Sequence, residues 1–390
     1  MGSQPSYKPD LPWYRNYDYW VSKANEYLLA AWRVPHGTAV QKEMDSFQRF
    51  NWARVIFESN LIEGAGMPSE GDTRKVIDDC FPEIPSSYSA FRALGENPFA
   101  RLLDADALTE NLEGILGTGL STEEVFPSVA MAGKSRQFIE VARHYHCLWL
   151  ASHFSLEHTY SRLAVIISNI VSKGMGPKEY LEEGASLLEA YKSELGRKRI
   201  VKRKLLTEGK IRELHKIIAG GLLPSDAGVP AGEYRIDNRS VGWDIAFPGP
   251  DLVPASMKAF ISTSQKATEW TFGLPDHVFD AQALASDRLF DAAAQVSYDF
   301  VRIHPFPDFN GRLSRVTMNM VFQSCGCIPI SIRGHKKGRR RYFSALKRAN
   351  RGDIKPLAAL IAIRVAETYG EIDDNLTRAG QPTILEAATM

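Results

Sequence analysis

The chain has 390 residues, of which 44% are hydrophobic and 24% are charged, and its formal net charge at pH 7 is +1. These proportions are ordinary for a globular protein, and the near-neutral charge argues against nucleic acid or an acidic membrane as a partner. No apolar N-terminal segment and no apolar run of membrane-spanning length occurs, and the four cysteines are too scattered for a disulfide scaffold, so we expect a cytoplasmic protein.

The first forty residues mix aromatic residues and prolines without a regular period, which predicts an extended arm or a partly disordered segment. A helix is predicted next, because no Gly or Pro occurs between Met44 and Ile62. Its apolar stripe consists of Phe47, Phe50, Phe57 and Leu61. Gly64 is well placed to end this helix.

Residues 59–64 read Ser-Asn-Leu-Ile-Glu-Gly, so Glu63 falls in the last turn of the predicted helix. A carboxylate is unfavourable there because the C-terminal end of the helix dipole is negative. Glu63 makes sense at this position if it reaches a cation on another element. The alternative is an ordinary surface or capping carboxylate, since Ser and Glu four residues apart occur on many helices.

Two further helical regions precede the middle of the chain. Residues 136–173 have the apolar pattern of a long buried helical pair, and residues 187–216 form another helical block. Four histidines in the first region lack the spacing of metal ligands, so we interpret them as packed or surface side chains. We interpret the basic cluster at 198–204 as a solvated surface. The basic cluster at 336–341 is expected to help attract ATP.

Residues 232–254 combine prolines and glycines with a few β-forming residues. Apolar residues alternate with small or polar ones from 241 to 247, which predicts a short strand or hairpin. An inert surface loop is the alternative for this segment.

The stretch from 304 to 315 reads His-Pro-Phe-Pro-Asp-Phe-Asn-Gly-Arg-Leu-Ser-Arg. His304 can take a proton near neutral pH, and Asp308 can hold a hard divalent cation. Residues 310–312 look like the first turn of a helix, where free N–H groups attract anions. Arg312 and Arg315 are three residues apart, so both can point toward the same phosphates.

This stretch resembles the signature of the Fic family, His-x-Phe-x-(Asp/Glu)-Gly-Asn-Gly-Arg-x-x-Arg. Seven of the eight defined positions are present, and Phe309 stands where the family usually has glycine. The flanking regions extend the resemblance, because 232–254 is similar to the family's flap and 59–64 to its inhibitory motif. We expect Phe309 to keep a right-handed backbone, since the left-handed conformation costs about 1–2 kcal/mol for such a residue.

The resemblance implies a mainly α fold with a Fic-like helical core at 205–370 and a short β-hairpin flap. It also implies an N-terminal helical extension, 1–204, which carries an inhibitory helix at about 44–64. Residues 371–390 lose periodicity and are predicted to be a flexible tail. By resemblance, the nucleotide-binding residues are Asp308, Phe309, Asn310, Gly311, Arg312, Leu313, Ser314, Arg315, Tyr342 and Asn350. The flap residues are Trp243, Asp244, Ile245 and Ala246.

The activity that the resemblance implies is protein adenylylation, in which AMP moves from ATP to a Ser, Thr or Tyr hydroxyl of a target protein. His304 would be the catalytic base, Asp308 would bind Mg²⁺, and Glu63 would inhibit by pairing with Arg315. Removal of AMP and a homo-oligomer are both compatible with the resemblance. The alternative from another class is a non-catalytic helical peptide-binding module whose nucleotide site is spoiled by Phe309. For Tyr342 and Asn350, the alternatives are a core tyrosine and a C-capping asparagine.

Overall fold

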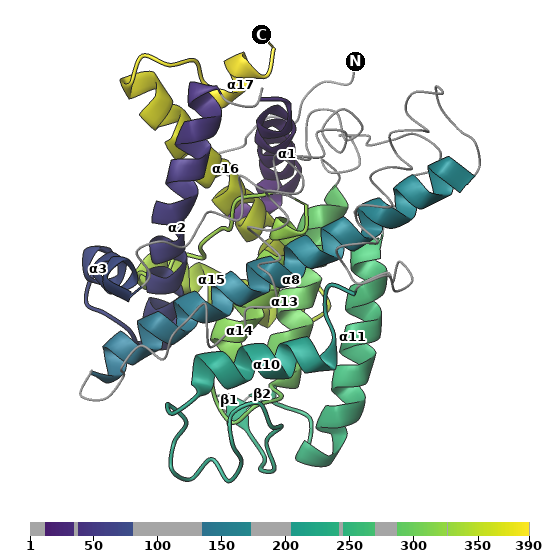
Figure 1. Cartoon of the computed structure of the whole chain (residues 1–390). Coiled ribbons are helices and arrows are strands. Elements are labelled where there is room, and N and C mark those ends of the chain that lie inside the picture. The colour runs from purple at the N-terminus through teal and green to yellow at the C-terminus, as the bar shows by residue number, and fades with distance from the viewer. Residues whose placement is uncertain are drawn as a thin grey trace.

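The computed structural model describes residues 12–34, 38–80, 135–172, 204–241, 245–269, 287–325 and 327–389 (Figure 1). The N-terminal elements are η1 (Trp13–Asn16), α1 (Tyr17–Arg33), α2 (Ala39–Glu63), α3 (Glu70–Cys80) and α8 (Arg136–Ser172). The elements of the C-terminal part are α10 (Glu208–Ala219), β1 (Ser240–Val241), β2 (Ile245–Ala246), η3 (Pro250–Leu252), α11 (Val253–Glu269), α13 (Asp287–Ile303), α14 (Asn310–Gln323), α15 (Lys336–Ala349), α16 (Lys355–Arg378) and α17 (Ile384–Ala387). The prediction of a mainly helical protein is therefore confirmed.

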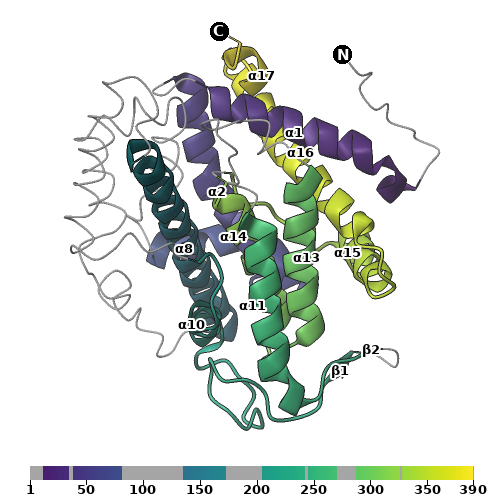
Figure 2. The same cartoon turned by 90° about the vertical axis from the view of Figure 1, so that its right-hand side faces the viewer.

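Helix α14 forms the centre of the molecule. It packs between α13 and α8, and α2 also contacts it. Every residue of α14 except Gly311 is buried, so this short helix has no solvent-facing side. Helix α11 lies beside α13 (Figure 2). The end of α13 and the start of α14 are joined by residues 304–309, so the signature stretch lies at one end of a rigid helical pair.

Helix α2 has the sequence signals expected of a well-defined helix. The Thr38 side chain accepts a hydrogen bond from the Gln41 N–H at 3.3 Å and caps the N-terminus. At the other end Gly64 adopts a left-handed backbone with φ of 71°, which glycine takes without a steric penalty. The predicted helix is confirmed, and it begins five residues before Met44. Its predicted apolar stripe is wrong in part, because Phe50 and Leu61 are exposed.

The prediction of an extended or partly disordered arm over the first forty residues is wrong for residues 17–33, which form helix α1 and pack along α16, while residues 1–11 and 35–37 lie outside the described residues. The buried stripe of α1 has the three- and four-residue spacing of a helix and consists of Tyr17, Val21, Ala24, Leu28 and Ala31. Aromatic residues on the other faces of α1 hid this period in the sequence. The predicted pair at 136–173 is also wrong, since α8 is one continuous helix.

The flexible tail predicted for 371–390 is wrong as well. Residues 371–378 complete α16, and α17 follows with a capping box formed by Thr383 and Glu386. The Asp373 carboxylate accepts a hydrogen bond from the Ile384 N–H at 2.7 Å, and Ile384 is buried. This end of the chain is therefore ordered against α1. The domain boundary near residue 204 stays a prediction, because helices from both sides share one hydrophobic core.

A two-stranded antiparallel hairpin lies at the end of the molecule away from α1 and α17 (Figures 1 and 2). Ser240 pairs with Ala246 and Val241 pairs with Ile245. The expected hairpin at 241–247 is thus present, while Trp243 and Asp244 lie outside the described residues. Among the described residues, no helix is long and apolar enough to cross a membrane.

Candidate active site

The loop between α13 and α14 reverses the chain with two unusual backbone conformations. His304 has φ of 51° and Phe309 has φ of 65°, and these are the non-glycine residues with positive φ in the described part of the chain. Each such residue costs about 1–2 kcal/mol, and strain of this kind clusters at functional sites. The expected right-handed backbone at Phe309 is therefore wrong. The ring of Phe309 is 2% exposed and lies 3.7 Å from the Arg312 guanidinium, so packing offsets the strain.

Asn310 locks this loop with its side chain. Its Oδ1 accepts a hydrogen bond from the Phe306 N–H at 3.0 Å, and its Nδ2 donates to the Phe306 carbonyl at 2.8 Å. The Asn310 amide therefore satisfies both backbone polar groups of Phe306, as a residue on a neighbouring β-strand would. Asn310 thus fixes the loop, and α14 begins with Asn310 as its first residue, as predicted.

The imidazole of His304 is held in one tautomer and one plane. Its Nδ1 lies 3.4 Å from the Val301 carbonyl oxygen, which can only accept, so the proton is on Nδ1 and the lone pair on Nε2. The ring of Phe247 stacks on it at 4.1 Å and 12°. Burial lowers the pKa of His304 to about 4; the hydrogen bond to Val301 opposes this shift and the charge of Arg235 adds to it. At neutral pH His304 is therefore an uncharged base.

Arg315 is paired with the end of helix α2. Its Nη2 lies 2.7 Å from Glu63 Oε1 and 2.9 Å from the Ser59 carbonyl oxygen, and its Nε donates to Ser59 Oγ at 2.9 Å. Burial alone would raise the pKa of Glu63, but the charge and hydrogen bond of Arg315 outweigh it and hold the pKa below its ordinary value. The expected Glu63–Arg315 contact is present, and Ser59 adds two bonds that the sequence did not predict.

Gly311 is needed where α2 approaches α14. A Cβ atom at this position would lie 2.3 Å from Glu63 Oε1, so any side chain here would displace the carboxylate. A larger residue at 311 could therefore not coexist with Glu63 in the observed position.

Arg312 is a buried cation with incomplete pairing. It is 5% exposed, and its Nε and Nη1 have no hydrogen-bond partner among the residues that the structure describes. Burial lowers its pKa, and the carboxylates of Glu140, Asp308 and Glu63 act in the opposite direction. A buried guanidinium with unused donors favours an anion beside it, because its desolvation is otherwise uncompensated.

Asp308 is oriented by backbone contacts. Its Oδ1 accepts a hydrogen bond from the Phe309 N–H at 2.6 Å, and its carbonyl oxygen accepts from His215 Nε2 at 3.2 Å. Within the described residues, no group of three or more potential ligands could hold a metal ion by itself. The single carboxylate of Asp308 fits Mg²⁺, which is usually bound by one or two carboxylates together with substrate phosphates and water.

The other predicted nucleotide-binding residues differ in their burial and in the bonds that they make. Tyr342 is buried, and its ring centre lies 5.8 Å from the Arg315 guanidinium carbon, so it belongs to the site. Asn350 is exposed, occupies the C-cap position of α15 and accepts a hydrogen bond from the Tyr298 hydroxyl at 3.0 Å. Leu313 and Ser314 are buried, with Ser314 Oγ bonded to Ser297 of α13. Ser314 could therefore contact a nucleotide only through its backbone.

His215 of α10 was missed by the sequence analysis. It is fully buried and stacks on Phe306 at 3.8 Å and 4°. Its Nδ1 accepts a hydrogen bond from the Gly232 N–H at 2.8 Å, which leaves the proton on Nε2 for the carbonyl of Asp308. Burial lowers its pKa to about 4. No periodic signal marks it, because a single histidine on an apolar helix face resembles any other core residue.

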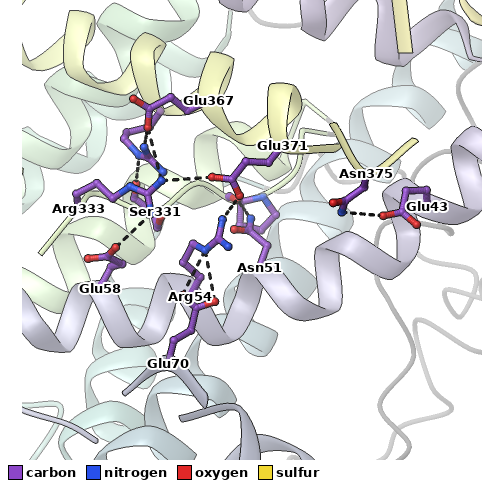
Figure 3. Close-up of polar contacts among 12 residues, drawn as sticks. Glu43, Asn51, Arg54, Glu58, Glu70, Ser331, Arg333, Glu367, Glu371 and Asn375 are labelled. Carbon is purple, nitrogen blue, oxygen red and sulfur yellow. Dashed lines mark hydrogen bonds and ion pairs between the residues drawn. The ribbon is translucent and has the colours of Figure 1, made fainter. Parts of the chain in front are cut away.

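A network of charged residues also joins α2 to α16 and to Arg333 (Figure 3). Glu58 pairs with Arg333 at 3.4 Å and accepts a hydrogen bond from the Gly334 N–H. Arg54 contacts Glu70 at 3.4 Å and pairs with Glu371 of α16. Glu58 precedes Ser59 directly, so this network anchors the segment of α2 that contacts Arg315.

Comparisons with known proteins agree with this geometry. Residues 205–322 match the model of the Fic/DOC family. The protein adenylyltransferase Fic of Drosophila virilis is 32% identical over 163 residues, which are 42% of this chain and 29% of that protein. The corresponding protein of Drosophila mojavensis is 32% identical over 163 residues, or 42% of this chain and 28% of that protein. The chain thus spans less than a third of the length of these relatives.

A solved structure, that of a Fic domain containing signaling protein from Bacteroides thetaiotaomicron, shares the fold. Its TM-score is 0.52 at 16% identity, and the match covers 94% of this chain and 98% of that chain. The family match includes the signature stretch 304–315, whereas Glu63, Tyr342 and Asn350 lie outside it.

Proposed function

We propose that this chain, whose residues 205–322 match the model of the Fic/DOC family, is a protein adenylyltransferase. It would transfer AMP from ATP to a Ser, Thr or Tyr hydroxyl of a target protein. The observation that carries this proposal is a neutral, oriented imidazole at the start of a turn that also holds a buried, incompletely paired arginine.

In this reaction, Nε2 of His304 takes the proton of the acceptor hydroxyl. The hydroxyl oxygen forms a bond to the α-phosphorus while the bond from that phosphorus to the bridging oxygen of pyrophosphate breaks. Pyrophosphate leaves with the electron pair, and the imidazolium later returns its proton to solvent. Because the pKa of His304 is lowered to about 4, essentially every molecule holds the base in its neutral form at pH 7.

The arginines of α14 supply the charge that phosphates require. Arg312 would use its unpaired Nε and Nη1 on the phosphates, and Arg315 would do the same once it leaves Glu63. Asp308 is the residue that would hold Mg²⁺, which neutralises phosphate charge when bound. Transfer from a nucleotide depends mainly on positioning and charge stabilisation, so no covalent enzyme intermediate is needed.

The hairpin β1–β2 would hold the target. Its strands pair only with each other in the described part of the chain, so an outer edge is free to accept an extended segment by strand addition. Phe247, which follows β2, stacks directly on His304. A backbone bound along this hairpin would therefore run close to the base.

Helix α2 would inhibit the enzyme. Glu63 and Ser59 occupy the donors that Arg315 would offer to the γ-phosphate. ATP could then bind only with its α-phosphate displaced, and a misplacement of about 1 Å can reduce a rate roughly a hundredfold. Removal of AMP is the second candidate reaction, and it would use the same site with Glu63 in place. The observation that favours it is that Glu63 is ionised and its side chain is 32% exposed.

Labelled ATP separates these functions from a non-catalytic module. In the Glu63→Gly variant, label on the α-phosphate should become covalently attached to protein, whereas label on the γ-phosphate should not. Adding His304→Ala should abolish attachment and leave ATP binding intact. Attachment of γ-label would show phosphate transfer instead, and no attachment of either label would favour the peptide-binding module.

A further inference from the structure

Arg235 connects three parts of the proposed active site. It lies just before the hairpin and is 1% exposed. Its Nε donates to the carbonyl of His304 at 2.7 Å, its Nη1 donates to the carbonyl of Asp237 at 2.6 Å, and its Nη2 donates to the carbonyl of Pro248. Its backbone N–H also donates to the carbonyl of Pro305 at 3.0 Å.

The acceptors of Arg235 are unusual for a buried cation. They are carbonyl oxygens, and the nearby carboxylate of Asp237 lies 2.8 Å from Nε of Arg239 instead. Burial lowers the pKa of Arg235, with the Asp237 charge opposing this shift. A buried charge without a bonded carboxylate is costly, so its retention calls for a specific role. The planar guanidinium can donate in several fixed directions at once, which the ammonium of lysine cannot reproduce.

The acceptor positions show what this side chain holds in place. Asp237 precedes β1 and Pro248 follows β2, so Arg235 joins the two ends of the hairpin. The third acceptor is the carbonyl of the base itself, at a residue with φ of 51°. Without this bond, His304 could relax to a backbone of lower energy and turn its imidazole away from Phe247.

We propose that Arg235 is a positioning residue that fixes His304 and the β1–β2 hairpin relative to each other, so that base and acceptor strand are aligned for transfer. This inference rests on the proposed function. Arg235 makes no contact with the α14 arginines among the bonds described, so ATP binding should not depend on it. Its loss should slow transfer without weakening the nucleotide site.

The test uses the full chain carrying Glu63→Gly, with Arg235→Ala compared with Arg239→Ala. Arg239 is the matched control because it is an arginine of the same segment whose partly exposed side chain pairs with Asp237. Self-modification with α-labelled ATP gives the maximal rate and the ATP concentration for half-saturation. We expect Arg235→Ala to lower the maximal rate about a hundredfold with the half-saturating ATP concentration within twofold of the parent, and Arg239→Ala to leave both unchanged.

Chemical rescue distinguishes positioning from a general structural role. Guanidinium at millimolar concentration should refill the space left by Arg235→Ala and restore transfer, whereas urea, a neutral molecule of similar shape, should not. Arg235→Lys, which keeps the charge and most of the volume, should remain slow. Parent-level transfer by Arg235→Ala or Arg235→Lys would overturn the proposal, as would loss of ATP binding together with transfer or equal rescue by urea.

Failure of the proposed function would be visible separately. If Glu63→Gly itself transfers no AMP, the proposed activity is wrong, and hydrogen exchange of the amides at 240–247 then tests Arg235 directly. Faster exchange in Arg235→Ala, with Arg239→Ala like the parent, would support the positioning role. Equal exchange in both variants would overturn it.

Discussion

Phe309 is held in a conformation that glycine would adopt more easily, yet its ring is buried against Arg312. The left-handed backbone costs about 1–2 kcal/mol, whereas removing a buried phenylalanine costs about 3–5 kcal/mol. Packing therefore wins at this position. The loop therefore keeps a left-handed backbone at a residue that is not glycine.

This balance predicts that, of two variants at Phe309, the glycine variant is more stable than the alanine variant. Both Phe309→Gly and Phe309→Ala should lower the free energy of unfolding, by roughly 2–4 kcal/mol, because both remove the ring. The glycine variant should be about 1 kcal/mol more stable than the alanine variant, because φ is positive. Urea unfolding of the three proteins measures this order. An alanine variant more stable than the glycine variant would mean that the loop does not keep φ near 65° in solution.

Two sets of contacts hold the C-terminal half of helix α2 in place. Glu63 and Ser59 contact Arg315, and Glu58 contacts Arg333 and Gly334. Glu58 is buried, so removing its carboxylate leaves Arg333 and the Gly334 N–H without that partner. The C-terminal half of α2 should then hold Arg315 less firmly.

We expect Glu58→Ala to raise self-modification several-fold over the parent and to have no effect when Glu63→Gly is already present. The second half of this expectation follows because the network acts only through the Glu63 contact. Glu26→Ala is a suitable control, since Glu26 forms an exposed ion pair with Lys23 at 3.7 Å on α1. Equal activity of Glu58→Ala and the parent would separate the network from inhibition.

The sequence predicted those elements whose signals are local. The helix ending at Gly64 and the turn at Asn310 follow from caps and motifs within a few residues, whereas the Glu63–Arg315 contact was expected only from the resemblance to the Fic family. Helix α1 was missed because aromatic residues on its other faces hid a buried stripe that includes two alanines, Ala24 and Ala31. The backbone at Phe309 was missed because only packing by Arg312 makes it tolerable.

The buried connectors of the site could not be predicted. His215 and Arg235 bond to backbone carbonyls and amides 17 to 93 residues away along the chain, apart from the Asp237 and Pro248 contacts of Arg235. Neither the residue type nor its spacing in the sequence predicts such bonds. They become evident only when the fold brings α10, the hairpin and the 304–309 loop together.

For the whole molecule, buried neutral histidines make stability depend on pH. Burial lowers the pKa of His146, His215 and His304 to about 4, below the ordinary value of 6.5 in the unfolded chain. The unfolded chain therefore binds more protons between these values. The stabilisation is complete above pH 6.5 and is lost as the pH falls toward 4.

The fully buried His215 should contribute about 2 kcal/mol to the loss of stability between pH 7 and pH 5. His215→Gln keeps an acceptor for Gly232 and a donor for Asp308 but cannot titrate, so its unfolding free energy should fall less over this interval. Urea unfolding at both pH values measures the difference. Parallel pH dependence in the parent and the variant would contradict a neutral, buried His215.

The proposal that this chain is an adenylyltransferase inhibited by Glu63 is tested by comparing three proteins. Parent, Glu63→Gly and Arg315→Ala are incubated with Mg²⁺ and ATP labelled on the α-phosphate, and label attached to protein is measured over time. We predict that Glu63→Gly incorporates label at least tenfold faster than the parent, and that Arg315→Ala does not, because it removes the phosphate contact together with the inhibitory pair. Equal incorporation by the parent and Glu63→Gly would contradict the account and leave Glu63 as an ordinary carboxylate at the end of a helix.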